Sequence, residues 1–465
     1  MTVDNQGDFR GGDGKPLRFW AVNTFAARER PFRPRPLWSS KTEVDLTRHA
    51  RFLAKRGVNM VRLHAHINPK PGAELTAIDP DERDWIWRTV AAMKSQGIYT
   101  TISPFWANTL KIGPTWGVPG GPDQPTHALL FFDETLQRGY RAWLKALFTE
   151  PNPFTGVPLA NDPAVAIIQI QNEDSLLFWT INNLKGEQRR ALGAKFGRWL
   201  SAKHGSLDQA FASWNTRELP GDDRQAGVVD FFNIWEMTQN RTGGVAKRLD
   251  DQLQFWCETM HQFHQDVVRY LREDLHCRQL VNAGNWKTAD AGRLNDAERW
   301  TYTPGEVLAV NHYFGGAHVG PNQGWAIGNG DQFTEKSALL DPQSLPINLK
   351  QVMGKAMMVT ESGWVSPNGR SVESPFLIAA YQSVTGVDGF FFFAFSDEGF
   401  SRPQSANGYM PSLAKWSMST PDVLGQFPAA AWIYRKGLVR KADPAVVERR
   451  ALDDLWRRKN AVIQE

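Results

Sequence analysis

Short apolar runs, each followed at once by polar residues, recur along almost the whole chain. They are rich in Val, Ile and Phe and apolar on both faces, as expected of strands that are covered on both sides. Eight runs fit this description, at 18–25, 59–65, 99–105, 164–173, 280–286, 307–313, 356–363 and 389–396. The pattern therefore predicts a buried parallel sheet.

Amphipathic segments lie between these runs. Helices are predicted at 43–56, 80–96, 134–148 and 372–385. Gly57 and Gly97 each stand just past a helix and just before a strand, which is typical of helix C-termini. Eight strands that alternate with helices predict an α/β fold of the (β/α)8, or TIM, barrel type. An open, doubly wound sheet is the alternative, but the count of eight and the polar strand ends favour closure.

Two long excursions interrupt this alternation. The first, 174–279, follows the fourth strand, and its pattern predicts helices at 187–204, 207–214 and 229–275. We expect these to be extra helices on the barrel rim. The second, 315–355, follows the sixth strand and is rich in Gly, Asn and Pro, which predicts a long loop, and such loops are usually functional. With a helical C-terminal segment at 429–465, residues 1–465 are expected to form a single elaborated catalytic domain.

The charge and cysteine content narrow the class of protein. The 465 residues include 53 basic and 49 acidic ones, so that nucleic acid and anionic membranes are not expected partners. No apolar run approaches the about 20 residues that span a bilayer. The two cysteines, Cys257 and Cys277, form no disulfide framework. No signal peptide is visible at the start, and both a cytoplasmic location and export after removal of a signal remain open, as does the oligomeric state.

Polar and aromatic residues gather where the predicted strands end. In a (β/α)8 barrel the active site lies at these ends, and its residues come from several strands. The candidates, in strand order from the second to the eighth, are Arg62, His64, Trp106, Asn172, Glu173, Asn285, Trp286, His312, Tyr313, Glu361, Trp364 and Phe395. We expect them to surround one substrate.

Two of these candidates, Glu173 and Glu361, are carboxylic acids that directly follow apolar strands. Glycoside hydrolysis needs such a pair, one protonated to help the leaving group depart and one ionised to attack the anomeric carbon or activate water. Either acid alone would be expected to have a structural role, paired with a neighbouring Arg or capping a helix. Their joint occurrence among Arg, His, Asn, Tyr and Trp favours catalysis.

The motifs around the two acids resemble those of a large clan of retaining glycosidases on (β/α)8 barrels, which includes glycoside hydrolase families 5, 2 and 42. IQIQNEDS is similar to the fourth-strand Asn–Glu motif of that clan, and VTESGW to its seventh-strand nucleophile. The resemblance implies that Glu173 is the general acid/base and Glu361 the nucleophile. It also implies that Asn172 contacts the sugar 2-hydroxyl, and that Arg62 and Tyr313 lie beside the nucleophile.

Two further segments refine the resemblance. FGRWLSAKHGSLDQAFASWNT, at 196–216, is similar to a helical segment of family 42 β-galactosidases. Many family 5 members carry Trp at the end of the eighth strand, where this chain has Phe393 and Phe395. The chain is therefore assigned to neither family.

The residues also suggest how the two acids differ. Arg62 should favour the ionised form of Glu361, while burial and the charge of Glu361 should raise the pKa of Glu173. The candidates for stacking on sugar faces are Trp106, Trp286, Trp364 and Phe395, and ordinary core packing is the alternative for each. His64, Asn285 and His312 are expected to line the same mouth.

The predicted function is retaining hydrolysis of β-glycosidic bonds in oligo- or polysaccharides. Exo action is expected because the two long excursions would close off an open groove. The alternatives are an inverting or endo-acting glycanase of the glucanase or mannanase type, and a catalytically silent carbohydrate-binding barrel. No cofactor or metal is expected, since Glu258, His261 and His264 lack a partner motif. The sequence does not distinguish galactosides, glucosides and mannosides.

Overall fold

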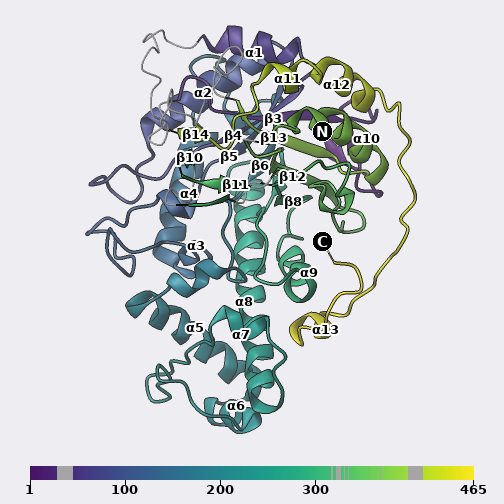
Figure 1. Cartoon of the computed structure of the whole chain (residues 1–465). Coiled ribbons are helices and arrows are strands. Elements are labelled where there is room, and N and C mark those ends of the chain that lie inside the picture. Colours follow the sequence, from purple (N-terminus) through teal and green to yellow (C-terminus); the bar gives the residue numbers. More distant parts are fainter. Residues whose placement is uncertain are drawn as a thin grey trace.

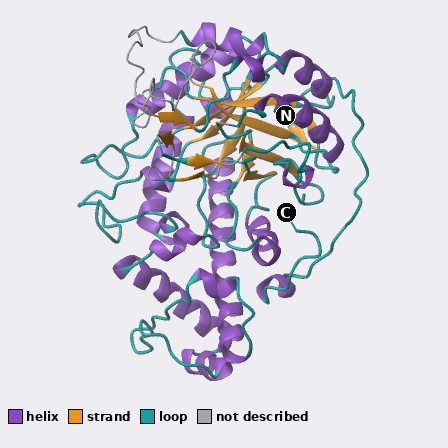
Figure 2. Cartoon of the chain, viewed as in Figure 1, coloured by secondary structure: helices purple, strands orange, loops and turns teal. Residues whose placement is uncertain are grey.

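The fold is a closed barrel of eight parallel strands, ordered β12-β13-β3-β4-β5-β6-β7-β8. The computed structural model describes residues 1–28, 45–315, 318–320, 326–328, 330–333, 335–366, 368–395 and 412–464. The barrel strands are β3 (Phe19–Thr24), β4 (Met60–His64), β5 (Tyr99–Ser103), β6 (Val165–Gln169), β7 (Leu280–Asn282), β8 (Val307–Asn311), β12 (Ala356–Ser362) and β13 (Gly389–Phe395). Each predicted strand supplies one of them, and the (β/α)8 prediction is confirmed (Figure 2).

The barrel interior changes from apolar to polar along the strands. Residues two apart on a strand share a face, and the interior begins with an apolar cluster that includes Phe19, Ala21, Met60, Ala309, Met358 and Phe391. Two residues further along β3 and β4 stand Asn23 and Arg62, both without exposed surface. The apolar layer closes one end of the barrel and leaves the polar layer at the carboxyl ends of the strands.

Helices cover the outside of the barrel (Figure 1). They are α1 (Leu46–Ala54), α2 (Pro80–Lys94), α4 (Glu134–Phe148), α8 (Gly243–Arg269), α9 (Ala291–Thr301), α10 (Ser374–Thr385) and α12 (Phe427–Arg435). The side chains of Asp45, Asp79, Asp133 and Asp290 accept backbone N–H groups at the starts of α1, α2, α4 and α9. Such caps contribute about 1 kcal/mol each, which explains why these helices begin where they do.

The segment after β6 protrudes from the barrel as a helical insertion (Figure 1). It contains α5 (Gly186–His204), α6 (Leu207–Trp214), α7 (Ile234–Met237) and the start of α8. The continuous helix predicted at 229–275 is wrong, because α7 ends at Met237 and α8 starts only at Gly243. Gly243 has a left-handed φ of 61°, and a Cβ on Gly244 would collide with the carbonyl oxygen of Trp214. The two glycines let the chain turn tightly against α6.

The C-terminal segment is not one helix, contrary to the prediction for 429–465. The helix α12 ends at Arg435, and Gly437 follows with a left-handed φ of 65°. Residues 438–451 then run along the outside of the molecule without helix to α13 (Leu452–Trp456), beside α9 (Figure 1). The Trp456 ring packs edge-on against Trp300 at 5.2 Å, which fixes the end of the chain to the barrel.

Short elements complete the described chain. They are β1 (Thr2–Val3), β2 (Phe9–Arg10), β9 (His318–Val319), β10 (Ala326–Gly328), β11 (Gln332–Phe333), β14 (Ser412–Ala414), α3 (Leu129–Phe132), α11 (Pro421–Leu424), and the short helical turns η1 (Ala107–Thr109), η2 (Leu159–Asn161), η3 (Trp179–Asn183), η4 (Tyr270–Asp274), η5 (Pro342–Ser344) and η6 (Ser371–Glu373). The predicted loop at 315–355 thus carries three short strands in its described parts. None of the helices in the described ranges combines the length and apolar character needed to span a bilayer.

Candidate active site

Arg62 on β4 organises the polar end of the barrel. A guanidinium has five N–H groups, and here each donates to a different side chain. The acceptors are Asn23 Oδ1 (2.9 Å), Ser103 Oγ (3.2 Å), Gln169 Oε1 (2.8 Å), Asn172 Oδ1 (2.7 Å) and Glu361 Oε1 (2.8 Å). Because these acceptors come from β3, β5, β6, β12 and the residues after β6, one buried side chain holds several strand ends in register.

Glu361, at the end of β12, is only 5% exposed and receives two donors. Its Oε1 accepts from Arg62, and its Oε2 accepts from the Tyr313 hydroxyl at 2.9 Å. Burial and the charge of Glu361 raise the pKa of Tyr313 well above its usual range, so this hydroxyl keeps its proton and remains a donor. A cation and an O–H group therefore both stabilise the Glu361 carboxylate.

A break in strand register lets Glu361 reach the site. The pairing of β12 with β8 shifts between Val359 and Glu361, so that Glu361 lies opposite Asn311. In a regular strand, Thr360 and Glu361 would point to opposite faces. Here the Thr360 hydroxyl donates to Asn311 Oδ1 at 2.8 Å while Glu361 bonds Arg62. The irregularity thus places two consecutive side chains in one network, as bulges near active sites often do.

Glu173 lies four residues beyond the end of β6, with a left-handed φ of 45°. Its backbone N–H donates to Asn285 Oδ1 at 2.8 Å, and its Oε1 accepts from Asn311 Nδ2 at 2.8 Å. Burial, and then the negative charge of Glu361, raise the pKa of Glu173 to about 8. The structure therefore favours a protonated Glu173 beside Glu361, which accepts from Arg62 and Tyr313.

Asparagine side chains connect the two acids. Asn285 Nδ2 lies within hydrogen-bonding distance of Asn172 Oδ1 (2.9 Å), Asn311 Oδ1 (3.1 Å) and Thr360 Oγ1 (3.1 Å). Because its Oδ1 also holds the Glu173 N–H, the amide of Asn285 is fully engaged in orienting its neighbours. Asn172 uses its Oδ1 for Arg62 and Asn285. Among the described residues no hydrogen bond involves its Nδ2, which leaves a donor for a ligand.

Aromatic and imidazole rings form one wall of the site. Trp106 is half-buried, and its ring centroid lies 5.5 Å from that of His64 and 5.9 Å from that of His66. Arg28 fixes this group, since Nη1 donates to the His64 carbonyl and Nη2 lies 3.1 Å from His66 Nδ1. His312 follows Asn311 and is half-buried, with its backbone N–H bonded to the Glu361 carbonyl. The structure thus brings His64, Trp106 and His312 to the strand ends, as predicted from the sequence.

Two predicted stacking residues lie in the core instead. Trp364 and Phe395 have no exposed surface. Trp364 packs on Phe314 at 5.0 Å, and Phe395 packs near Phe427 of α12 at 6.0 Å. Both rings are therefore covered by protein. Trp286, by contrast, is half-buried and packs edge-on against Phe178 at 4.8 Å.

Several residues that contact the site are not among the site residues predicted from the sequence. Phe393, not Phe395, faces Tyr313 of the site, at 6.2 Å between ring centroids. Gln169 and Asn23 accept from Arg62, but they lie inside apolar strands. The sequence signal for them is a polar residue within an otherwise apolar strand, two positions from an apolar residue, because the two then share one strand face.

A buried network anchors the loop that carries Glu173. Both carboxylate oxygens of Asp174 accept the Ala128 N–H, at 3.0 and 2.8 Å. The Ser175 hydroxyl donates to Glu298 of α9 at 2.6 Å, and the Tyr302 hydroxyl donates to the same carboxylate at 2.5 Å. Burial raises the pKa of Glu298 to about 7. The two residues that follow Glu173 are therefore tied to the segment before α3 and to α9.

The residues present do not suggest a metal site. Across the ranges that the structure describes, no three His, Cys, Asp or Glu side chains cluster as metal ligands do. The two acids are instead held by side-chain N–H and O–H donors. The arrangement can deliver a proton from one carboxyl group and a negative charge from the other.

Comparisons with known proteins find solved structures that share the fold of this chain. No family model and no curated protein matches the chain. A GH42 β-galactosidase from G. stearothermophilus superimposes with a TM-score of 0.53 at 12% identity, over 92% of this chain and 58% of that one. The β-galactosidase from the psychrophilic Marinomonas ef1 gives a TM-score of 0.52 at 14% identity, over 90% and 60%.

These similarities confirm the predicted resemblance at the level of the fold. The chain shares its (β/α)8 barrel with these glycosidases, and it spans less than two thirds of the length of either β-galactosidase. The β-galactosidase from Rahnella sp. R3 is similar to the same degree, with a TM-score of 0.52 at 14% identity over 90% of this chain and 57% of that one. Function has to be argued from the site.

Proposed function

We propose that this protein is a retaining β-glycosidase. The observation that carries the proposal is that two carboxyl groups lie in one hydrogen-bonded network but in different surroundings. Arg62 and Tyr313 stabilise the Glu361 carboxylate, whereas burial and the charge of Glu361 raise the pKa of Glu173. A nucleophile and a general acid need this difference.

The proposed reaction has two steps. In the first, Glu361 attacks the anomeric carbon while Glu173 gives its proton to the departing glycosidic oxygen. The negative charge of Glu361 disappears in the covalent ester, so one of the causes of the high pKa of Glu173 is removed. Glu173 can then accept a proton from water, which cleaves the ester and restores both acids.

The neighbouring residues have supporting roles in this proposal. The free Nδ2 of Asn172 is available to a sugar hydroxyl next to the reacting carbon, as the clan resemblance implies. Asn285 and Asn311 orient Glu173 through its backbone N–H and its carboxyl group. We further propose exo action, because the helical insertion and the long loop both begin at strand ends that border the site.

Small-anion rescue tests the two roles separately. In Glu173→Ala, azide should attack the glycosyl-enzyme ester and give a glycosyl azide with the anomeric configuration of the substrate. In Glu361→Ala, azide should enter from the face of the missing carboxylate and give the inverted azide. Proton NMR of the products distinguishes the two outcomes. The same configuration from both variants would contradict the assignment.

Substrate choice supplies a second test of the acid. Aryl β-galactosides, β-glucosides and β-mannosides with good and poor leaving groups form the panel. Glu173→Ala should lose most activity on poor leaving groups and far less on activated ones, because only the poor ones need protonation. Equal losses on both, or inversion of configuration by the unaltered protein, would rule out this mechanism.

A further inference from the structure

An aromatic segment continues directly from the loop that carries Glu173. Phe178 is half-buried and packs against Trp286, while the next residue, Trp179, is 42% exposed. Trp286 directly follows Asn285, whose side chain holds the Glu173 N–H. Trp179 follows Glu173 by six positions, so their Cα atoms lie at most about 22 Å apart. The aromatic segment therefore packs on the neighbour of a residue that contacts Glu173.

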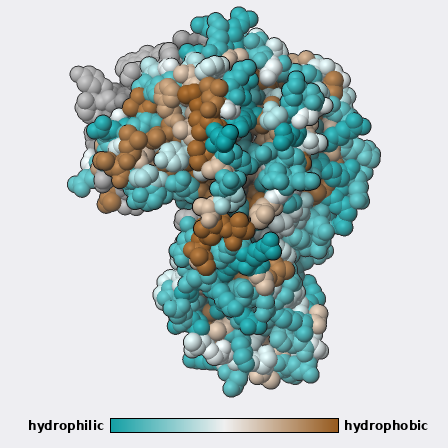
Figure 3. Space-filling model, turned by 90° about the vertical axis from the view of Figure 1, so that its right-hand side faces the viewer, coloured by the Kyte–Doolittle hydropathy of each residue, from teal (hydrophilic) through white to brown (hydrophobic). Residues whose placement is uncertain are grey.

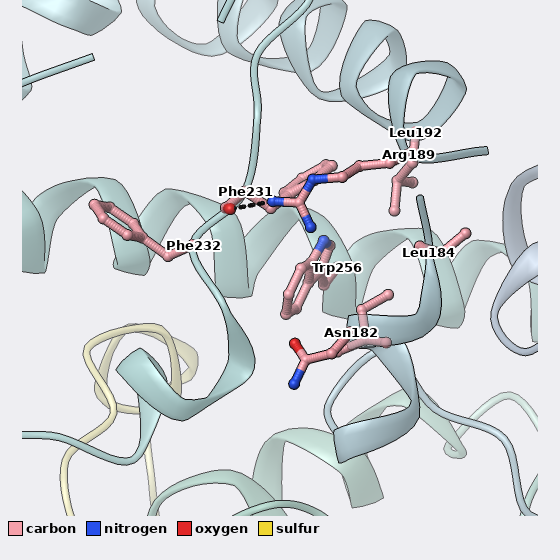
Figure 4. A pocket seen from close by; sticks show the side chains of 8 residues that line it. Asn182, Leu184, Arg189, Leu192, Phe231, Phe232 and Trp256 are labelled. Atoms are coloured by element: carbon pink, nitrogen blue, oxygen red, sulfur yellow. Dashed lines mark hydrogen bonds between the residues drawn. The ribbon is translucent and has the colours of Figure 1, made fainter. Parts of the chain in front are cut away.

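The turn η3, which starts at Trp179, is firmly attached to the insertion. Ile181 and Leu184 are buried and line a small pocket with Trp256 of α8 and Arg189 of α5 (Figure 4). Asn182, at the edge of this pocket, accepts the Ile234 N–H at 3.4 Å. The apolar residues of the turn are thus used for anchoring, and the exposure of Trp179 is not explained by a loose segment.

A second exposed tryptophan stands beside this turn. Trp235 is 48% exposed and follows Ile234, whose N–H is bonded to η3. The Arg241 guanidinium lies over its ring at 5.6 Å and is itself paired with Glu236 at 2.5 Å, which holds the ring in place. Hydrophobic residues also gather where the insertion meets the barrel on the face shown in Figure 3. Fixed, exposed indoles of this kind are typical of binding surfaces.

We propose that Trp286, Phe178, Trp179 and Trp235, here called the aromatic row, bind the leaving-group part of a β-linked oligosaccharide. The inference rests on the proposed function. A general acid protonates the glycosidic oxygen, so the leaving group lies on the side of Glu173, and the row starts from that side. The apolar faces of sugar rings stack on aromatic rings, and the indole N–H groups suit their hydroxyls.

The location of the row also bears on substrate length. Lys287 lies over Trp286 at 6.0 Å and is exposed, which gives the start of the row a polar rim. From there the row leads into the insertion and away from the barrel. A single aryl or methyl leaving group would reach only its start. A chain of several sugars would reach Trp179 and then Trp235, so the row selects oligosaccharides over simple glycosides.

Chain-length kinetics test the row. We compare Trp179→Ala and Trp235→Ala with the unaltered protein on an aryl glycoside and on oligosaccharides of increasing length. Trp432→Ala is the matched control, because Trp432 is 59% exposed on α12 and lies outside the row. KM for the longer substrates should rise about two- to tenfold in the two row variants, with kcat unchanged. The aryl glycoside should react normally.

The outcomes separate this inference from the proposed function. Normal KM values for long substrates in both row variants, or an equal rise in KM in Trp432→Ala, would show that the row does not bind the leaving group. Neither result would contradict the proposed hydrolysis. Calorimetry with the unaltered protein tests the case in which the protein binds oligosaccharides but does not hydrolyse them. Oligosaccharide binding without any turnover, weakened by Trp179→Ala, would overturn the proposed function and keep the row. A dimer in sedimentation that Trp235→Ala dissociates would instead assign the row to self-association.

Discussion

Replacement of Arg62 by Met gives a strong test of the site architecture. The variant removes all five N–H donors from a fully buried position. The largest effect comes from Glu361, which would remain 5% exposed without its cation. Breaking a buried ion pair in this way costs about 3–5 kcal/mol. The four neutral acceptors add further losses of about 1 kcal/mol each where water cannot replace the donor.

Urea unfolding at neutral pH measures the effect, with the slope m as a check that the same transition is observed. Arg62→Met should lose at least about 3 kcal/mol. Arg88→Met is the control, because Arg88 pairs with Asp84 on the surface at 40% and 43% side-chain exposure, and such pairs contribute less than about 1 kcal/mol. The double variant Arg62→Met/Glu361→Gln should recover part of the loss, since no charge is then buried alone.

The result that would refute this reasoning is a loss for Arg62→Met no larger than that for Arg88→Met. A double variant less stable than Arg62→Met would also contradict it, because the unpaired charge of Glu361 would then not be the cause. Either result would mean that the Arg62–Glu361 contact at 2.8 Å is not what holds the strand ends together.

Three further predictions follow from the same contacts. The rate constant kcat/KM should fall as pH rises through about 8, where Glu173 loses the proton that the leaving group needs; a limb at the same pH in Glu173→Ala would contradict this. Tyr313→Phe removes the O–H donor to Glu361, a charged hydrogen bond worth about 1.5–3 kcal/mol, so kcat/KM should drop roughly ten- to hundredfold. Burial raises the pKa of Asp388 from its ordinary value of 3.8 to about 8, so the folded protein keeps a proton that the unfolded chain releases. The free energy of unfolding should therefore fall as pH rises from about 4 to about 8, and Asp388→Asn should flatten this dependence in urea titrations.

The sequence alone was sufficient to predict the barrel and the placement of Glu173 and Glu361 at its strand ends. Apolar runs bounded by polar residues mark parallel strands, and topology then places their ends together. Glu173 and Glu361 lie in one hydrogen-bonded network at those ends. The pattern is informative because a strand that is buried on both faces consists mainly of apolar residues.

The same pattern could not show which face some residues occupy. The register shift between Val359 and Glu361 depends on pairing with β8, which no local signal reveals. A similar shift in β13, between Phe392 and Phe395, accompanies the placement of Phe393 rather than Phe395 near Tyr313. Asn285 was expected to bind substrate, yet its amide is engaged by neighbouring side chains. One extra residue in a strand reverses the direction of every later side chain.

The helix α8 belongs both to the insertion and to the barrel. Its 27 residues make a rod about 40 Å long. Phe255 in its first half packs on Phe196 of α5 at 5.0 Å, whereas His264 in its second half bonds the Thr301 carbonyl of α9 at 2.8 Å. A hinge between the two parts would have to bend this rod. Anyone shortening the insertion to make a smaller catalyst should therefore excise α5 to α7 and keep α8 whole.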